Sequence, residues 1–167
     1  MGRVLLGIIL GVLLMPVLGY LYLTSGRFPV ATADPPFPFE KRVARLSQHA
    51  RYVEAAKLQS PVGADEAAFV AGAKIYKDDC AVCHGLPNQP IGIIPKGMFP
   101  GPPQLLDKDD MVTDDPAGTT YWKVANGIRM TGMPAFKGAL NDTQLWQVTQ
   151  LLAHADKLPP AATDILK

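Results

Sequence analysis

The residues best suited to chemistry are two cysteines three positions apart and a histidine directly after the second: Cys80, Cys83 and His84. Each thiol of such a pair can add to one vinyl group of a porphyrin, which leaves two thioether bonds. The adjacent imidazole is then positioned to bind one face of the porphyrin iron. The chain contains two cysteines in all, so this motif uses every thiol. The spacing predicts one covalently bound haem c, held by Cys80 and Cys83, with His84 as an iron ligand.

Three other uses of paired cysteines fit the sequence less well. A structural zinc site needs four ligands, and the remaining histidines, His49 and His154, lie far from the motif along the chain. A thioredoxin-like redox pair is expected beside a βαβ pattern, but no strand-like alternation flanks Cys80. A disulfide between Cys80 and Cys83 closes too short a loop to constrain the chain.

A methionine in the C-terminal half is the best candidate for the second axial position of the iron. Met133 lies in a loop between two predicted helices, and the following Pro134 restricts the backbone there. We therefore predict Met133 as the second iron ligand. The alternatives are Met130 first, then Met98 and Met111, and His154 as a remote one.

The N-terminal residues Val4 to Leu23 form an uncharged, apolar run of 20 residues. This length suffices to cross the hydrocarbon core of a bilayer as a helix, and membrane helices tolerate a proline such as Pro16. A cleaved signal peptide is the alternative, because Ala31-Thr32-Ala33 is similar to a cleavage site. The run exceeds a usual signal-peptide core, so we predict a retained transmembrane anchor over residues 1–26.

A linker and a basic amphipathic helix are predicted for residues 27–60. Four prolines in the first part (Pro29, Pro35, Pro36 and Pro38) indicate an extended, semi-rigid spacer. Beyond it, apolar side chains recur at helical spacing between arginines: Phe39, Val43, Leu46, Ala50 and Val53. Such a helix can contact anionic lipid or a partner subunit. It can equally pack on the globular domain with its basic face in solvent, and both interpretations remain open.

Residues 61–167 are predicted to form an all-α globular domain. Helical apolar spacing follows each of three capping signals: Asp65, Asp115-Pro116, and Asn141 with Gln144. Gly72 either lets another helix approach closely or is merely tolerated in its helix. The segment Leu86–Leu106 contains six prolines and should be irregular. Its apolar side chains are expected to cover a haem face, with an exposed partner-binding loop as the alternative.

The charge distribution argues against nucleic-acid binding. The formal net charge is +1. Residues 34–60 carry a net charge of +2, and residues 61–167 carry a net charge of −3. An acidic run occupies part of the second segment: Asp107, Asp109, Asp110, Asp114 and Asp115. No basic stripe with interleaved aromatic residues is present, so we expect no nucleic-acid partner.

From about Asp65 to its end, the chain resembles the class I c-type cytochromes, specifically bacterial monohaem domains. The resemblance is carried by Gly72, Tyr76, the motif of residues 80–84, a proline-rich loop, Asn126-Gly127, Gly132-Met133-Pro134 and Trp146. It implies a small fold of about three to five helices around a covalently bound haem. It also implies that the first and last helices of the domain cross at right angles near Gly72, with Tyr76 and Trp146 close by. Finally, it implies that the carbonyl of a loop proline accepts a hydrogen bond from His84.

These features predict a membrane-anchored cytochrome that carries single electrons between redox protein partners. The haem domain should lie in the periplasm, on a single-pass anchor in a bacterial inner membrane. The alternative is a fixed subunit of a membrane complex: an oxidase, a quinol oxidoreductase, a dehydrogenase or a photosynthetic reaction centre. A haem-based sensor is a third interpretation. No acid–base pair, phosphate loop or activated nucleophile indicates an enzyme activity of its own.

Overall fold

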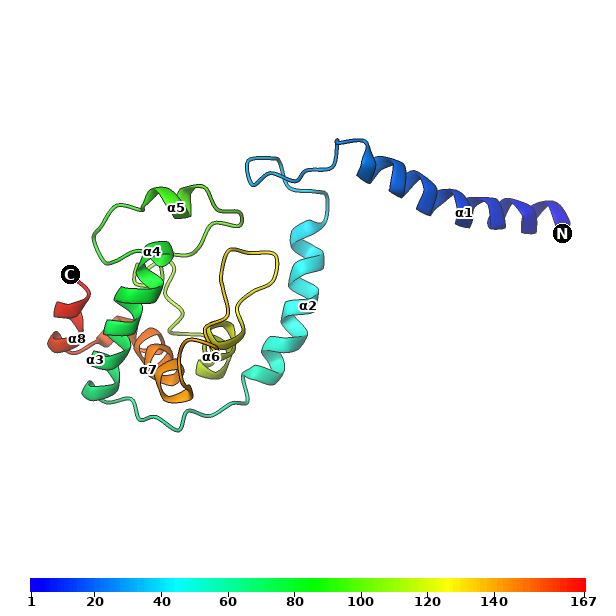
Figure 1. The fold of residues 1–167 in the computed structure, drawn as a ribbon. Coiled ribbons are helices and arrows are strands. Elements are labelled where there is room, and N and C mark those ends of the chain that lie inside the picture. The colour runs from blue at the N-terminus through cyan, green and yellow to red at the C-terminus, as the bar shows by residue number, and fades with distance from the viewer. The chain divides into compact units, whose positions relative to one another are not determined.

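The computed structural model describes residues 1–167 and contains helices without strands, which confirms the all-α prediction (Figure 1). The chain divides into two compact units, Met1–Glu40 and Lys41–Lys167, and each is described by itself. The second unit includes both the basic helix and the globular domain. The division into residues 1–26, 27–60 and 61–167 stays a prediction.

The first unit contains helix α1 (Gly2–Thr24), which has no buried residue. It is the one helix long and apolar enough to cross a membrane, with a mean hydropathy of 2.6 over 18 residues. A signal sequence near the N-terminus has the same character. The spacer after α1 is folded locally rather than extended. Asp34 accepts hydrogen bonds from the amides of Val30 and Ala31, both at 2.9 Å, and the rings of Phe28 and Phe37 lie 5.4 Å apart.

Helix α2 (Glu40–Ala55) begins the second unit and packs on α6 (Ala117–Asn126) through its C-terminal end. The ring of Tyr52 meets that of Trp122 edge to face at 5.8 Å, and the Tyr52 carbonyl accepts a hydrogen bond from the Thr119 hydroxyl. Gly118 lies against the carbonyls of Ala55 and Leu58, where a Cβ atom would clash. The sequence alternative in which this helix packs on the domain is therefore correct for its C-terminal end.

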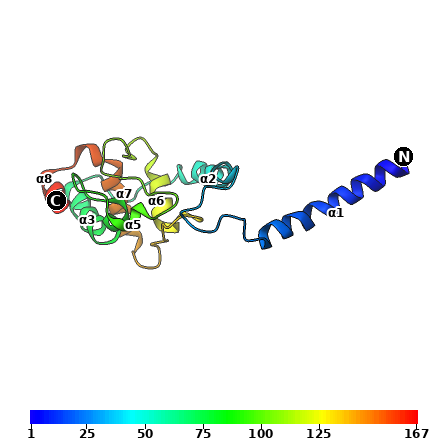
Figure 2. The ribbon, with the colours of Figure 1, turned by 90° about the horizontal axis from the view of Figure 1, so that it is seen from above.

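The core of the second unit lies where α3 (Glu66–Ile75) crosses α7 (Asp142–Ala153), with α8 (Pro160–Ile165) beside α3 (Figures 1 and 2). Gly72 is the point of closest approach: a Cβ atom there would clash with the Gln147 carbonyl and lie 3.1 Å from the Leu151 Cβ. The close-approach interpretation of Gly72 is thus confirmed. The largest side chains buried in this contact are Tyr76, Leu145, Val148 and Leu151.

The predicted caps of α3 and α7 are present. Asp65 accepts from the Ala68 amide at 2.9 Å, and Asn141 with Gln144 completes a capping box. The start of α6 differs from prediction, because Pro116 is the capping residue and contributes no side-chain hydrogen bond. The Asp115 carboxylate instead forms an ion pair with Lys123, with an N–O distance of 2.9 Å. Lys123, about two turns into α6, therefore takes the Asp115 carboxylate that was predicted to cap the helix.

The contact between α6 and α7 is aromatic. Trp146 stacks on Tyr121 with ring centroids 4.1 Å apart and an interplanar angle of 14°. The Tyr121 hydroxyl also donates a hydrogen bond to Asp142 in the first turn of α7. Trp146 directly precedes Gln147, which meets Gly72 in the α3–α7 crossing, and its ring packs on α6.

The segment between residues 85 and 116 is irregular except for the short helix α5 (Ile93–Lys96), as its prolines predict. The ends of this segment differ from its middle in burial. Leu86, Leu105 and Leu106 pack against the core. In contrast, Ile93 and Ile94 on α5 are 88% and 54% exposed. The ends of the segment are therefore packed, and its middle is an exposed apolar surface; its role as cover for a haem face stays a prediction.

Candidate haem-attachment site

A continuous helical stretch delivers the two cysteines and the histidine. After α3, one turn of π-helix (Tyr76–Cys80) leads into α4 (Ala81–His84). Such π turns are frequent at functional sites, because the extra residue redirects the side chains that follow. Both thiols are free and half-buried. Burial, aided by the neighbouring Asp79 carboxylate, raises the pKa of the Cys80 thiol to about 12, so this group is a neutral thiol at physiological pH.

The His84 ring is oriented by one backbone carbonyl. Its Nδ1 lies 2.7 Å from the carbonyl oxygen of Pro103. Since a carbonyl can only accept, Nδ1 carries the proton in this hydrogen bond and Nε2 keeps a free lone pair. Burial lowers the pKa of His84 despite the opposing effect of the Pro103 carbonyl, which favours this neutral form. The structure thereby identifies Pro103 among the loop prolines as the partner that the resemblance implied.

Gly85 lets the proline-rich segment reach His84. Gly85 ends α4 with a φ of 71°, a left-handed conformation that glycine adopts without strain. The Gln104 side chain occupies the space where a Cβ of Gly85 would lie. The backbone N–H of Gln104 donates a hydrogen bond to the Asp110 carboxylate at 2.9 Å, which fixes the backbone next to Pro103. The left-handed backbone at residue 85, which favours glycine, therefore accompanies the approach of the Pro103 carbonyl to the imidazole.

Tyr76 holds the backbone at the end of α4. Its side chain is fully buried, and its hydroxyl donates to the carbonyls of Gly85 at 2.9 Å and His84 at 3.2 Å. Burial raises the pKa of Tyr76 well above 10. Tyr76 thus links the α3–α7 core to the backbone position of His84.

We expect Tyr76→Phe to lower the free energy of unfolding by about 1–3 kcal/mol, because two partly buried carbonyls lose their donor. Because the folded-state pKa lies above the unfolded value of 10, the wild-type stability should fall as pH rises above 10. The variant should lose less stability over that interval. Urea titrations at pH 8, 10 and 11 measure both effects. Equal alkaline slopes in the two proteins would show that the Tyr76 hydroxyl is not held as described.

The loop that carries Met133 folds back onto the end of α6. Gly127 ends that helix with a φ of 66° and lies so close to Met133 and Pro134 that a Cβ would clash. The Met133 carbonyl accepts from the Ile128 amide at 3.3 Å, and its amide donates to the Thr131 hydroxyl at 3.1 Å. Beyond the loop, Phe136 and Lys137 donate to the last carbonyls of α6. The backbone of Met133 is therefore constrained on both sides.

The segment that supports His84 also touches the loop of Met133. The methyl group of Met98 lies against Gly132, where it occupies the space of a Cβ atom. Met98 and Pro103 belong to the same proline-rich segment, so this segment contacts His84 at one point and the residue before Met133 at another. The predicted pair of axial residues is thus joined through one stretch of chain. The Met133 side chain is half-buried and packs against the core.

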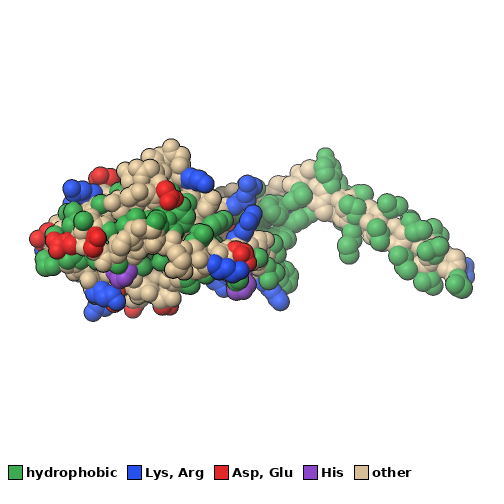
Figure 3. Space-filling model, turned by 90° about the horizontal axis from the view of Figure 1, so that it is seen from below, with side chains coloured by type: hydrophobic (Ala, Val, Ile, Leu, Met, Phe, Trp, Pro, Cys, Tyr) green, Lys and Arg blue, Asp and Glu red, His purple; other side chains and the backbone are tan.

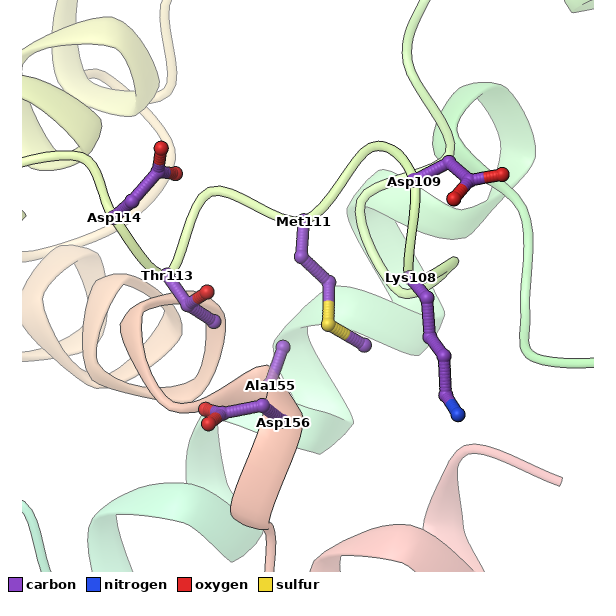
Figure 4. Close-up of a pocket in the computed structure, with 7 residues that line it drawn as sticks. All are labelled: Lys108, Asp109, Met111, Thr113, Asp114, Ala155 and Asp156. Carbon is purple, nitrogen blue, oxygen red and sulfur yellow. The ribbon is translucent and has the colours of Figure 1, made fainter.

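The other candidate ligands lie in different surroundings. Met130 is 69% exposed. Met111 lines an open pocket with residues of the 3-10 turn Ala155–Lys157, and that pocket contains neither cysteine nor His84 (Figure 4). The Nδ1 of His154 donates a hydrogen bond to the Gln150 carbonyl at 2.9 Å, and its ring lies 5.3 Å from the ring of Phe69. The remaining candidate, Met98, comes from a distant part of the chain and contacts Gly132 in the loop of Met133.

The donor set fits a haem rather than a bare metal ion. No group of three or more His, Cys, Asp or Glu side chains is placed to hold a metal, so the zinc alternative lacks its ligands. A haem c is held by two thiols and an imidazole with a free lone pair, and a thioether can serve as its second axial donor. Cys80, Cys83, His84 and Met133 offer these groups.

The sequence analysis did not identify Thr131 and Gln104 as residues of the site. For Thr131, the available signal was a hydroxyl two residues before Met133.

Comparison with known proteins agrees with this chemistry. Residues 67–152, just over half of the chain, match the family model described as cytochrome c oxidase, cbb3-type, subunit III. The matched range includes the motif of residues 80–84 and Met133. Comparison with curated proteins found no match, and comparison with solved structures found none. Because the family model covers the helices and loops that form the site, the chain belongs to the cbb3-type cytochrome c oxidase subunit III family and has a c-type cytochrome domain that binds haem c covalently.

Proposed function

We propose that this chain is a membrane-anchored carrier of single electrons. Cys80 and Cys83 hold one haem c through thioether bonds, and His84 and Met133 ligate its iron. The observation that carries the proposal is the hydrogen bond between His84 Nδ1 and the Pro103 carbonyl at 2.7 Å. Metal-binding histidines donate their second ring N–H to such an acceptor, which sets the tautomer and the ring orientation.

The residues of the site favour electron transfer over catalysis. When bound, haem c supplies a one-electron iron couple. With His84 and Met133 both ligating its iron, the haem would keep no position for a substrate. Tyr76 and Pro103 hold the imidazole in place, and the Thr131 hydrogen bond holds the backbone of Met133. A rigid ligand set changes little between oxidation states, as a carrier requires.

A redox partner is expected to dock beside the motif. Val82 lies between the two cysteines and is 56% exposed, and α5 adds the exposed Ile93 and Ile94. Exposed apolar side chains near a redox centre give a partner a desolvated contact. The acidic residues from Asp107 to Asp115 can steer a basic partner towards this surface.

The proposal places the haem domain in the periplasm of a bacterial cell. Helix α1 is compatible with a single-pass anchor by its length and hydropathy. Covalent haem attachment is expected outside the cytoplasm, so the second unit should lie on the outer side of the inner membrane. Tethering raises the effective concentration of the carrier near membrane-bound partners.

A second candidate function is that of a fixed subunit of an oxidase. The family description, which names an oxidase subunit, favours it. The two functions differ in mild detergent. A free carrier should purify alone, whereas a subunit should purify with other chains in constant ratio. Native mass spectrometry of the purified protein distinguishes them.

Potentiometric titration of the purified full-length chain tests the carrier function itself. We expect one reversible transition that follows a one-electron Nernst curve, and no binding of carbon monoxide by the reduced protein. Ready binding of carbon monoxide by the wild type would contradict the closed ligand set and would favour a sensor.

A further inference from the structure

Helix α2 uses one face to pack on its own domain. Ala44, Gln48 and Tyr52 are half-buried and Ala55 is buried, and these positions share one side of the helix. This side makes the contacts with Thr119 and Trp122 of α6. The face of α2 that packs on the domain therefore contains only one large apolar side chain, Tyr52.

The most apolar face of α2 points the opposite way. Val43, Leu46 and Val53 are 63%, 68% and 49% exposed, and Ala50 completes the stripe. Their spacing of three, four and three residues places them on one side of the helix, turned away from α6. Four apolar positions in one exposed stripe are not explained by packing within the domain, and they indicate a separate contact.

Basic side chains are in excess on α2, and Arg42 and Arg45 lie along one edge of this stripe. Lys41, Arg42, Arg45 and Arg51 lie on α2, against the two acidic residues Glu40 and Glu54. Glu54 is already paired with Lys57 at 2.9 Å. Figure 3 shows apolar side chains over α2 with Lys and Arg side chains beside them. An apolar stripe bordered by arginines suits the boundary between acyl chains and anionic headgroups.

The chain keeps α2 within reach of a bilayer that holds α1. The two helices are joined by residues 25–39. Even fully extended, such a segment reaches only about 50 Å, and its local folding shortens it. A lipid surface is therefore always available to the stripe, whereas a protein partner must be encountered.

We propose that α2 lies along an anionic bilayer surface, with Val43, Leu46, Ala50 and Val53 inserted at the acyl boundary and its arginines on lipid phosphates. Because its other face is packed on α6, this contact holds the haem domain at the membrane in one orientation. The inference rests on the proposed anchoring by α1. It goes beyond that anchoring, which by itself leaves the domain free to turn on its linker.

Photocrosslinking of the full-length holoprotein in liposomes tests this contact. A benzophenone amino acid is placed at Leu46 in the stripe, at His49 on the exposed polar side of α2, or at Leu13 in α1. Each protein is reconstituted in phosphatidylcholine with or without phosphatidylglycerol and irradiated. Intact mass spectrometry then identifies lipid adducts and protein adducts. The Leu13 probe reports on anchoring alone, so a failure of the anchor is distinguished from a failure of α2 to bind.

We expect the Leu46 probe to give several-fold more lipid adduct than the His49 probe, and several-fold less when phosphatidylglycerol is omitted. Lipid adducts at Leu13 without any at Leu46 would overturn the inference and leave the anchor intact. Adducts of Leu46 with protein would assign the stripe to a second copy or a partner instead. Equal lipid adducts at Leu46 in both lipid mixtures would overturn the role of the arginines.

Discussion

Replacing Met133 by alanine is expected to remove the absorption band that a thioether bound to ferric iron produces. The thioether ligand raises the reduction potential of a haem, so the potential of Met133→Ala should fall by roughly 0.1–0.3 V, within the ≈0.8 V range that axial ligands control. The vacated position should also let the reduced variant bind carbon monoxide. Absorption spectroscopy and potentiometric titration of the purified holoprotein measure these changes.

Met98→Ala is the matched control for the Met133 prediction. Met98 belongs to the segment that supports His84, and its methyl group contacts Gly132 beside Met133. Its loss should perturb packing but leave the thioether band in place. If Met98→Ala removes the band and Met133→Ala retains it, the two methionines have been assigned the wrong roles.

Gly72→Ala is expected to cause a large loss of stability in the helical core. An added Cβ would clash with the Gln147 carbonyl and lie 2.9 Å from its carbonyl carbon. Backbone atoms cannot turn aside as a side chain can, so α3 and α7 must separate. We expect a loss of about 3 kcal/mol, at the upper end of the usual cost of overpacking, and a drop in Tm of roughly 10 °C or more.

Gly138→Ala provides the control, because no atom lies within 4 Å of a Cβ at that position. Its effect on unfolding should stay within about 0.5 kcal/mol, as is usual for surface substitutions. Urea denaturation of both variants followed by circular dichroism makes the comparison. Similar midpoints for the two variants would mean that α3 and α7 do not approach each other at Gly72.

Local signals in the sequence were sufficient for much of the helical framework. Asp65 and the Asn141–Gln144 capping box begin their helices as predicted, and Gly127 ends α6. In each case the signal involves atoms within a few residues of one another, so tertiary packing has little opportunity to override it. The small size of Gly72 could be noticed from the sequence, but only the structure identifies Gln147 as the reason for it.

Features that depend on distant residues could not be predicted in the same way. Asp115 pairs with Lys123 rather than capping α6, since an ion pair is available there. Six prolines in residues 86–106 offered equivalent carbonyls to His84, and the choice of Pro103 depends on the path that Gln104 and Gly85 impose. The exposed side of α2 likewise required knowledge of which face packs on α6.

The most direct test of the proposed site is the mass of one tryptic peptide from the purified full-length holoprotein. Cleavage after Lys77 and Lys96 releases residues 78–96, which contain both cysteines and His84. The proposal predicts that this peptide carries the mass of one haem through two thioether bonds, and that no other peptide carries haem. Recovery of the peptide with two free thiols, from protein made in a host competent for haem attachment, would contradict it.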